Sequence, residues 1–313
     1  MAGLNLVVVV VLLLFAYIYG TTMVLVVVPW LNFSVPGVVH ASLLSFTTLM
    51  ALVCYLQCVF GNPGYSSSEW SPETEEGAVG IPVKNGGGIR QCRKCDPPRH
   101  KPPRTHHCKE CKKCVLRMDH HCIWVNNCLG HANYKSFILF LLYVLAACVH
   151  CLVLLMSYTI YSMHNRHREK AALRAAVRFT ENTRAAVLTS GYYAVFSSIL
   201  QLFCISILMP LCVALAILFG WHVYLVSQNL TTIEFYEGVR TLENQKVGTC
   251  QLKRHLYDLG LLKNVQQVLG TRPLWWFIPK SGSTMGDGHS FPTYVDMCRR
   301  RTQSAHGPME MDT

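Results

Sequence analysis

Apolar residues along this chain are gathered in four long blocks and are not spread with a helical period. Three of the blocks, at 4–30, 38–60 and 137–161, each supply the ~20 apolar residues that a helix needs to cross ~30 Å of hydrocarbon. The pattern therefore predicts three membrane-spanning helices at these positions.

The fourth block, at 194–226, is too long for one upright span and too short for two spans with a turn. It predicts one tilted helix that projects beyond the bilayer, with a bend at Pro210, where a backbone donor is missing. The first block follows no basic residue and is longer than a signal-peptide core, so we expect it to be retained. The fold class is all-α, an integral membrane protein with four transmembrane helices.

The distribution of Lys and Arg sets the expected orientation. With four spans, both termini share a side with the 61–136 loop, and that side carries 22 of the 28 basic residues, against 6 in the 162–188 loop. Basic residues stay in the cytosol, so we expect a cytosolic loop and termini and a lumenal 162–188 loop. This topology and attraction to anionic lipid explain the net charge of +11, which gives no support for nucleic-acid binding.

The expected domains follow from these blocks. Turn-forming and acidic residues fill the 61–91 segment, which we interpret as a linker. The chain then divides as follows: 1–60, helices 1 and 2; 61–91, the cytosolic linker; 92–136, a small cysteine-rich domain between helices 2 and 3; 137–226, helices 3 and 4; and 227–313, a cytosolic tail.

Seven of the 15 cysteines fall between Cys92 and Cys128. Thiols stay reduced in the cytosol, so metal binding is favoured over disulfides. The C-x2-C steps suit zinc, because two intervening residues allow a tight turn to present both thiolates to one ion. The other eight cysteines lie mostly in or near the spans, where they are expected to be small buried hydrophobes.

Counting ligands leaves one cysteine over. Two closed sites of three cysteines and one histidine use six of the seven cysteines, and Cys122 is the only one preceded by two histidines. Adjacent side chains point in different directions, so one histidine can bind zinc while the other faces the thiol. A base and a carboxylate beside a thiol favour its thiolate, and Asp119, His120 and Cys122 have the residue types this requires.

At this point the segment resembles the DHHC family of protein S-acyltransferases, integral membrane enzymes that move a fatty acyl group from coenzyme A to a protein cysteine. The similar residues cover the ordered cysteine-rich run and its continuation into the third span. They extend to a Thr-Thr-x-Glu motif after the fourth span and to a C-terminal motif with an asparagine. In this chain they are Asp119-His120-His121-Cys122, Trp124, Asn127, Cys128, Gly130, Asn133, Thr231 to Glu234 and Lys263 to Gly270.

The resemblance implies a role for each matching residue. His120 would be the base, Asp119 its orienting carboxylate and Cys122 the nucleophile. Thr232 would reach toward Asp119, while Glu234 and Asn264 would tie the tail onto the membrane core. Two interleaved structural zinc sites would be formed by Cys92, Cys95, His107 and Cys114, and by Cys108, Cys111, His121 and Cys128.

The implied function is protein-cysteine S-palmitoyl transfer, with acyl-CoA as co-substrate and cysteine-containing, membrane-associated proteins as acceptors. The implied location is the Golgi or another endomembrane, with the plasma membrane as the alternative. For the acyl chain we expect a cavity lined by Trp124, Ala146 and Ala147, because the two alanines lie ~15 Å along the third helix from Phe137. Close helix packing is the other explanation for such small residues.

Three departures from the family pattern stand out. Ile123 occupies the position of the usual proline after the nucleophile, Asn62-Pro63-Gly64 replaces Asp-Pro-Gly, and the gap between Cys95 and His107 is about two residues longer. A longer gap only enlarges a loop, which costs little. Losing a rigid residue beside the nucleophile affects the rate more than the reaction class.

Two other function classes fit the sequence less well. A zinc module that only binds, such as a cross-braced ubiquitin-ligase adaptor, would have a closing C-x2-C pair and no unliganded cysteine, whereas five residues separate Cys122 from Cys128. A transporter is disfavoured because the four spans contain no charged residue. His150 is polar at span depth, and a hydrogen bond between helices is its expected state.

Overall fold

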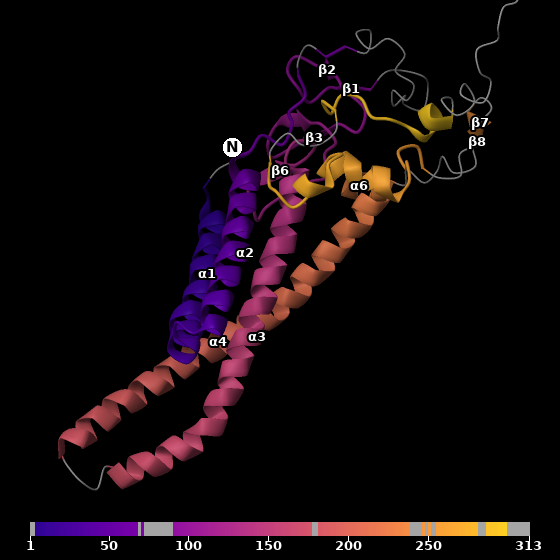
Figure 1. Cartoon of the computed structure of the whole chain (residues 1–313). Coiled ribbons are helices and arrows are strands. Elements are labelled where there is room, and N and C mark those ends of the chain that lie inside the picture. Colours follow the sequence, from indigo (N-terminus) through magenta and orange to yellow (C-terminus); the bar gives the residue numbers. More distant parts are fainter. Residues whose placement is uncertain are drawn as a thin grey trace, which may run out of the picture. The chain divides into compact units, whose positions relative to one another are not determined.

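The computed structural model of the protein describes residues 4–67, 70–71, 90–176, 181–237, 246–247, 250–251, 255–280 and 286–298. Among these, the side chains of 166–176, 181–190, 246–247 and 250–251 are not described. Four helices in this part of the chain are long and apolar enough to cross a membrane (Figure 1). Their apolar windows lie in Leu6–Leu31, Val35–Phe60, Tyr134–Asn165 and Gly191–Ser227. The predicted all-α, four-helix architecture is confirmed.

The helices begin and end close to the predicted positions, with one exception described below. The first span continues as a π-helix around Pro29, which lacks the backbone donor of a regular helix. The α4 helix runs through Pro210 without interruption. The helices are α1 Leu6–Thr22, the π-helix Met23–Leu31, α2 Val35–Phe60, α3 Tyr134–Ala176, α4 Glu181–Ser227, α5 Thr232–Glu237, α6 Leu261–Leu269 and a 3-10 turn Pro273–Trp275.

The segment expected to be a lumenal loop, 162–188, is largely helical. The α3 helix extends to Ala176 and α4 begins at Glu181, so helix covers all but 177–180, which lie outside the described residues. Both helices thus continue beyond the apolar blocks from which the spans were predicted. Residues 168–176, REKAALRAA, are strong helix formers although they are too polar to span a membrane.

Short antiparallel hairpins make up the cysteine-rich domain. Strands β1 and β2 pair, as do β3 with β4 and β5 with β6, and a fourth hairpin, β7 with β8, lies in the tail. The bounds are β1 Gln91–Cys92, β2 Arg99–His100, β3 His106–Cys108, β4 Lys113–Val115, β5 His120–Cys122, β6 Asn127–Leu129, β7 Lys246–Val247 and β8 Cys250–Gln251.

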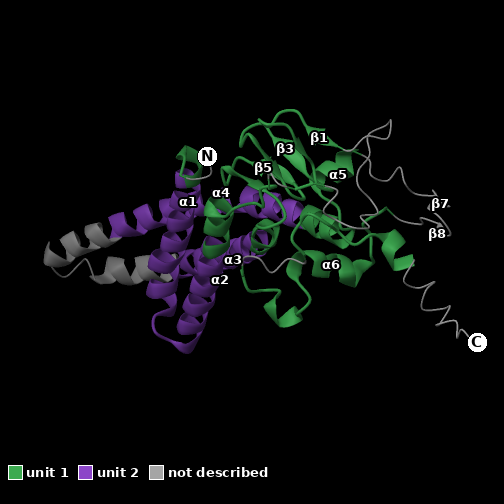
Figure 2. Cartoon of the chain, turned by 90° about the horizontal axis from the view of Figure 1, so that it is seen from above, with its two compact units in different colours: residues 1–8, 53–139, 220–313 green, residues 9–52, 140–219 purple. Residues whose placement is uncertain are grey.

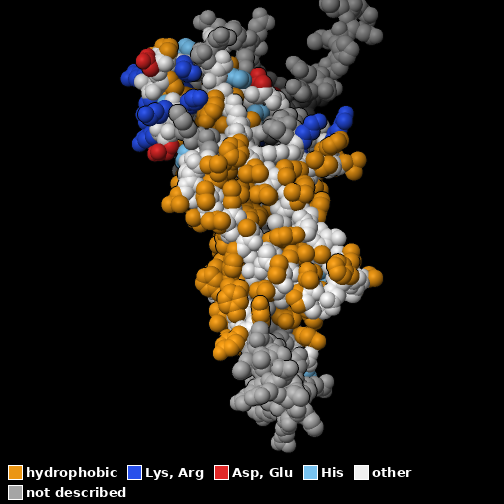
Figure 3. All heavy atoms as spheres, turned by 90° about the vertical axis from the view of Figure 1, so that its left-hand side faces the viewer, with side chains coloured by type: hydrophobic (Ala, Val, Ile, Leu, Met, Phe, Trp, Pro, Cys, Tyr) orange, Lys and Arg blue, Asp and Glu red, His pale blue; other side chains and the backbone are white. Residues whose placement is uncertain are grey.

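The chain divides into two compact units (Figure 2). The first holds 1–8, 53–139 and 220–313, and it contains the cysteine-rich domain, one end of each of the four spans, and the tail. The second holds 9–52 and 140–219, the remaining lengths of the four spans. Its core is apolar and includes Val26, Leu44, Leu155 and Leu208, while other hydrophobic side chains face outward, as expected for lipid contact (Figure 3).

The beginning of the predicted linker belongs to the cysteine-rich domain. Asn62 Oδ1 accepts hydrogen bonds from the backbone amides of Gly64 and Tyr65, at 2.9 and 3.1 Å, which closes a turn after α2. Beyond it Ser66 N donates to Cys114 O at 3.0 Å, and Tyr65 pairs with Val115. The amide oxygen of Asn62 can thus replace the carboxylate of the family's aspartate as an acceptor. Most of the rest of the linker, 72–89, lies outside the described residues.

Candidate active site and metal-binding clusters

The first metal-binding cluster joins two hairpins, β1–β2 and β3–β4. Nδ1 of His107 lies 3.4 Å from Sγ of Cys92 and of Cys95 and 3.8 Å from Sγ of Cys114, and the last two sulfurs are 3.7 Å apart. Four such ligands around one tetrahedral zinc, with bonds of ~2.3 Å to sulfur and ~2.0 Å to nitrogen, would be separated by about 3.5–3.8 Å. The four residues therefore fit one metal ion without rearrangement.

The second cluster also consists of three cysteines and one histidine, and the spacing of its ligand atoms also fits one metal ion. Nδ1 of His121 lies 3.6, 3.5 and 3.6 Å from the sulfurs of Cys108, Cys111 and Cys128. Cys111 and Cys128 Sγ are 3.5 Å apart. In both clusters all ligand atoms lie within 4.8 Å of one another. Each can hold a metal ion, and the two groupings are those that the resemblance implied.

Strand alternation explains why neighbouring residues serve different sites. Successive side chains of a β-strand point to opposite faces. On β3, His107 faces the first cluster while Cys108 faces the second. Residues of β3 thus belong to both clusters, so neither can form without fixing the other.

The same alternation separates the two histidines of β5. His121 contributes to the second cluster, whereas Nδ1 of His120 lies 2.6 Å from Oδ2 of Asp119. Cys122 is two residues beyond His120 and therefore emerges on the same face of the strand. The hairpin brings together the carboxylate, the imidazole and the thiol that the sequence singled out.

Asp119 is buried and fully hydrogen-bonded. Besides His120, it accepts hydrogen bonds from Thr232, whose backbone N–H reaches Oδ1 and whose Oγ1–H reaches Oδ2, both at 2.9 Å. Only 1% of Asp119 is exposed. Burial raises the pKa of its carboxyl group, but the hydrogen bond and charge of His120 outweigh this, so the pKa is lowered and the group is ionised.

The surroundings of His120 favour a proton on its ring. Burial opposes protonation, yet the hydrogen bonds to Asp119 and Cys122 and their charges raise its pKa to about 9. Cys122 itself is buried at 7% exposure, immediately before an exposed hairpin turn that contains Ile123 and Trp124. The arrangement can therefore accept the thiol proton and stabilise the resulting imidazolium, which is the chemistry of an activated cysteine.

Three residues that the sequence did not single out for the site, His222, Tyr134 and Phe137, pack beside it. His222 of α4 lies near Asp119 and His120, with one ligand atom of each within 4.8 Å of the others. The hydroxyl of Tyr134 is 2.9 Å from His222 Nδ1. The rings of Phe137 and His222 are 4.9 Å apart and both contact the His120 ring. A histidine or an aromatic in an apolar block carries no distinguishing signal, so sequence reasoning missed them.

A buried ion pair joins the cysteine-rich domain to α5, the short helix that follows α4. Arg104 donates from Nε and Nη2 to the two carboxylate oxygens of Glu234, at 2.6 and 2.7 Å, and also to Asn229. Arg117 donates to the same Asn229 side chain at 2.8 Å. Burial and the charge of Arg104 lower the pKa of Arg117 to about 10. The family resemblance predicted a structural role for Glu234, but it did not identify Arg104 and Arg117 as its neighbours.

Asn264 fixes α6 to the last turn of the fourth span. Its Nδ2 donates to Ser227 O and to Asp258 Oδ1, both at 2.7 Å, and its Oδ1 accepts from Leu259 N at 2.9 Å. The side chain is fully buried. A buried amide with its donors and acceptor satisfied in this way holds the tail in one position.

The residues proposed for an acyl cavity lie in different environments. Ala147 is buried in the core of the second unit, beside Cys148 and Cys151, whereas Ala146 is on an exposed face of α3. Trp124 is 59% exposed at the hairpin turn, and its carbonyl accepts from Tyr55 Oη at 2.8 Å. Of the two alanines, only Ala147 faces the helix-packed interior.

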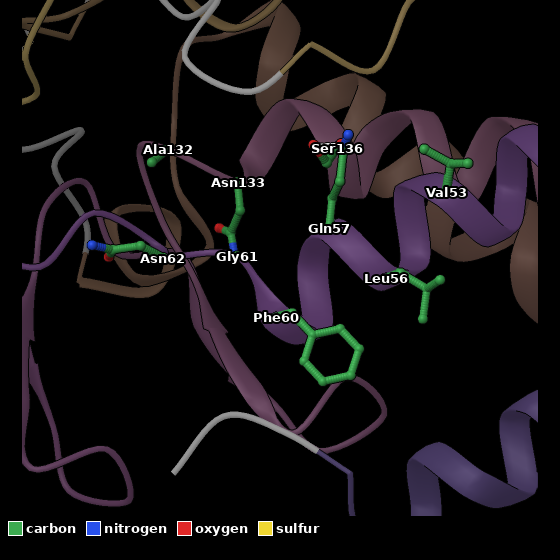
Figure 4. Close-up of a pocket in the computed structure, with 9 residues that line it drawn as sticks. All are labelled: Val53, Leu56, Gln57, Phe60, Gly61, Asn62, Ala132, Asn133 and Ser136. Carbon is green, nitrogen blue, oxygen red and sulfur yellow. Dashed lines mark hydrogen bonds between the residues drawn. The ribbon is translucent and has the colours of Figure 1, made fainter.

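One pocket of about 500 Å³ lies at the last turns of α2 (Figure 4). It is lined on one side by Val53, Leu56 and Phe60, and on the other by polar residues that include Asn133 and Ser136. Tyr55 and Cys58, which contact Trp124 of the β5–β6 hairpin and Asn133 just after it, are absent from its lining. The pocket therefore belongs to a different face of α2 from the one that meets Trp124.

Comparison with known proteins places the chain in a family. A family model described as DHHC palmitoyltransferase matches residues 87–239. The protein named "Probable protein S-acyltransferase 16" from Arabidopsis thaliana is 36% identical over 307 residues, which cover 97% of this chain and 98% of that protein. "Palmitoyltransferase ZDHHC15" from Homo sapiens is 34% identical over 207 residues, which cover 66% of this chain and 51% of that protein.

These matches extend along nearly the whole chain and include the cysteine-rich domain and the residues after the fourth span. The chain belongs to the DHHC palmitoyltransferase family. The family assignment and the class of enzyme predicted from the sequence are confirmed.

Proposed function

We propose that this protein transfers a long-chain acyl group, with palmitoyl as the reference substrate, from acyl-CoA through a thioester on Cys122 to cysteines of membrane-associated proteins. Family membership supports protein S-acylation as the reaction class. The observation that carries the assignment of residues is the 2.6 Å contact between Asp119 and His120, with Cys122 on the same strand face as His120.

In the first half-reaction Cys122 attacks the carbonyl carbon of the acyl-CoA thioester. His120 accepts the thiol proton, the bond between Cys122 Sγ and the acyl carbon forms, and the bond to the sulfur of CoA breaks. The CoA thiolate leaves with the proton that His120 held. Asp119 keeps the His120 ring in the orientation required throughout, because its carboxylate holds Nδ1 while Thr232 holds the carboxylate.

The second half-reaction repeats these steps with a protein thiol. His120 takes the proton of the substrate cysteine, the new thiolate attacks the acyl carbon, and Cys122 leaves and recovers the proton from His120. Both half-reactions exchange one thioester for another of similar energy, so positioning and deprotonation are what the enzyme must supply.

We propose one zinc ion for each of the two Cys/His clusters, and a purely structural role for both. Three thiolates and one imidazole fill a tetrahedral shell and leave no open position for a substrate. The chain's own contribution is to hold β3, β5 and their turns at fixed separations. The hairpins in turn keep His120 and Cys122 in a fixed position relative to the ends of the spans.

Membrane placement supports acyl-CoA and membrane-associated proteins as the two substrates. A fatty acyl chain and a lipid-anchored acceptor both partition into the bilayer, which concentrates them near a site at its surface. The first unit groups residues near both termini with the cysteine-rich domain, in keeping with a cytosolic location for all three. We propose the Golgi or another endomembrane, with the plasma membrane as the alternative.

The direct test is mass spectrometry of the purified full-length protein after exposure to palmitoyl-CoA. We expect a palmitoyl thioester on the peptide that contains Cys122, removable by hydroxylamine and by transfer to an acceptor peptide. Cys54, buried in α2, provides a matched control, because Cys54→Ser should load as wild type does. Modification of another cysteine in place of Cys122, or loading that survives in Cys122→Ser, would contradict the proposed mechanism.

A further inference from the structure

A nine-residue segment of the tail has the composition of a membrane interface. Its sequence, RPLWWFIPK at 272–280, consists of apolar residues with a basic residue at each end. Trp, Phe, Leu and flanking Lys or Arg are the residues that gather where hydrocarbon meets lipid headgroups. The motifs that define the enzyme end before it, at Gly270.

These apolar side chains face outward. The exposed fractions are 89% for Leu274, 44% for Trp275, 60% for Phe277 and 45% for Ile278. Four large exposed apolar residues within five positions form a patch that a water-soluble surface would not normally carry. The segment is nevertheless fixed in place, since the Nε1–H of Trp276 donates to Gly270 O at 2.8 Å.

Two hydrogen bonds place the segment at the ends of the spans. Lys135, in the first turn of α3, donates from Nζ to Trp275 O at 2.8 Å. Gln57, in the last turn of α2, donates from Nε2 to Pro279 O at 2.9 Å. Both partners belong to apolar spans, so the segment lies at the depth where those helices leave the bilayer. Phe60, in the same turn of α2 as Gln57, is itself 57% exposed.

The charges of the segment match an anionic surface. Arg272 and Lys280 are both exposed, and Lys280 Nζ lies 5.6 Å from the centre of the Trp275 ring. No acidic residue occurs between 271 and 280. Basic residues beside an inserted aromatic can contact lipid phosphates while the rings enter the upper hydrocarbon.

We propose that residues 272–280 form an interfacial anchor, with Leu274, Trp275, Phe277 and Ile278 inserted in the cytosolic leaflet and Arg272 and Lys280 bound to anionic phospholipid headgroups. The bilayer is the occupant that the position favours, because the segment is hydrogen-bonded to the first turn of α3 and the last turn of α2, both apolar spans. The anchor would attach the tail to the bilayer, in addition to its contacts with the protein such as that of Asn264 with the end of α4.

The test uses the full-length protein in nanodiscs of phosphatidylcholine with or without phosphatidylserine. A photoreactive p-benzoylphenylalanine replaces Phe277, an exposed site at which the new ring has room. The same probe at Phe60, at the end of α2, is the positive control, and at Lys109, in the turn between β3 and β4, the negative control. Mass spectrometry identifies what each probe has captured after irradiation.

We expect phospholipid adducts at position 277 with a yield comparable to that at position 60, and none at position 109. Each of the two basic residues should enrich phosphatidylserine among the adducts at position 277 by about fivefold, relative to the fraction of phosphatidylserine in the nanodisc lipid. The double substitution Arg272→Gln and Lys280→Gln should remove that enrichment. Capture of a second copy of the chain, of another segment of the same chain or of water alone at position 277 would overturn the proposal. Lipid adducts without enrichment would overturn the headgroup contact.

Discussion

Thr232 holds Asp119 with two hydrogen bonds across 113 positions of the chain, one from its backbone N–H and one from its hydroxyl, both 2.9 Å long. The carboxylate that orients the candidate base is therefore fixed by a residue just after the fourth span. Folding of the tail and competence of the site are linked through this contact.

Removing the Thr232 hydroxyl should slow acyl loading. A hydrogen bond to a charged group contributes about 1.5–3 kcal/mol, so we expect Thr232→Val to lower the rate of Cys122 acylation by tenfold or more. Thr232→Ser keeps the donor and should stay close to wild type. Loading can be followed by quenched-flow and mass spectrometry, with metal content measured in parallel. Equal rates in the valine and serine variants would show that the hydroxyl does not support catalysis.

The nucleophile and the metal scaffold should be separable. Cys122 belongs to neither cluster, whereas Cys108 is a ligand of the second. We expect Cys122→Ser to lose acyl loading but to retain about two zinc ions per chain, and Cys108→Ser to lose metal and unfold the hairpins. Zinc analysis of both purified variants by plasma mass spectrometry decides this. A proportionate loss of zinc from Cys122→Ser would refute the assigned ligand sets.

The two neighbouring histidines should behave differently. We expect His120→Ala to keep its metal and to slow both loading and transfer by about a hundredfold or more, the usual range for a lost general base. His121→Ala should resemble the loss of a cysteine ligand. Single-turnover acylation and zinc content, measured on the same preparations, distinguish the two outcomes. The opposite pattern would exchange the roles of the two residues.

Neutralising Glu234 should destabilise the protein strongly. Glu234→Gln leaves the guanidinium groups of Arg104 and Arg117 buried without a carboxylate beside them, and breaking one partner of a buried pair costs about 3–5 kcal/mol. Glu237→Gln, at an exposed position on the same helix, is the matched control and should change little. Thermal unfolding in detergent, followed by tryptophan fluorescence, measures the difference. Similar melting temperatures for the two variants would contradict the role of the ion pair.

The preference for acyl-chain length can be tested with two adjacent alanines. If the end of the acyl chain reaches the interior around Ala147, then Ala147→Phe should shift loading from sixteen and eighteen carbons toward fourteen or fewer. Ala146→Phe, on the exposed face of α3, should keep the wild-type profile. Loading of Cys122 from a series of acyl-CoAs measures both. An unchanged profile in Ala147→Phe, with normal total activity, would show that this alanine serves helix packing alone.

The linear pattern of residues determined the features that depend on composition and spacing. Blocks of apolar residues place four membrane helices because any segment in hydrocarbon must satisfy its own backbone hydrogen bonds. The surplus of one cysteine over two complete ligand sets singled out Cys122, because ligand number is fixed by the metal. Family resemblance then named partners, such as Thr232 for Asp119, that spacing alone could not supply.

Tertiary structure decided the contacts between residues distant in sequence and the faces that side chains occupy. Arg104 and Glu234 are 130 positions apart, and His222 meets Asp119 only because α4 returns to the cysteine-rich domain. No local pattern encodes such pairs. Exposure follows the same rule: the apolar composition of 272–280 does not say which side chains are exposed, and only the structure shows them facing outward on a segment hydrogen-bonded to Lys135 and Gln57.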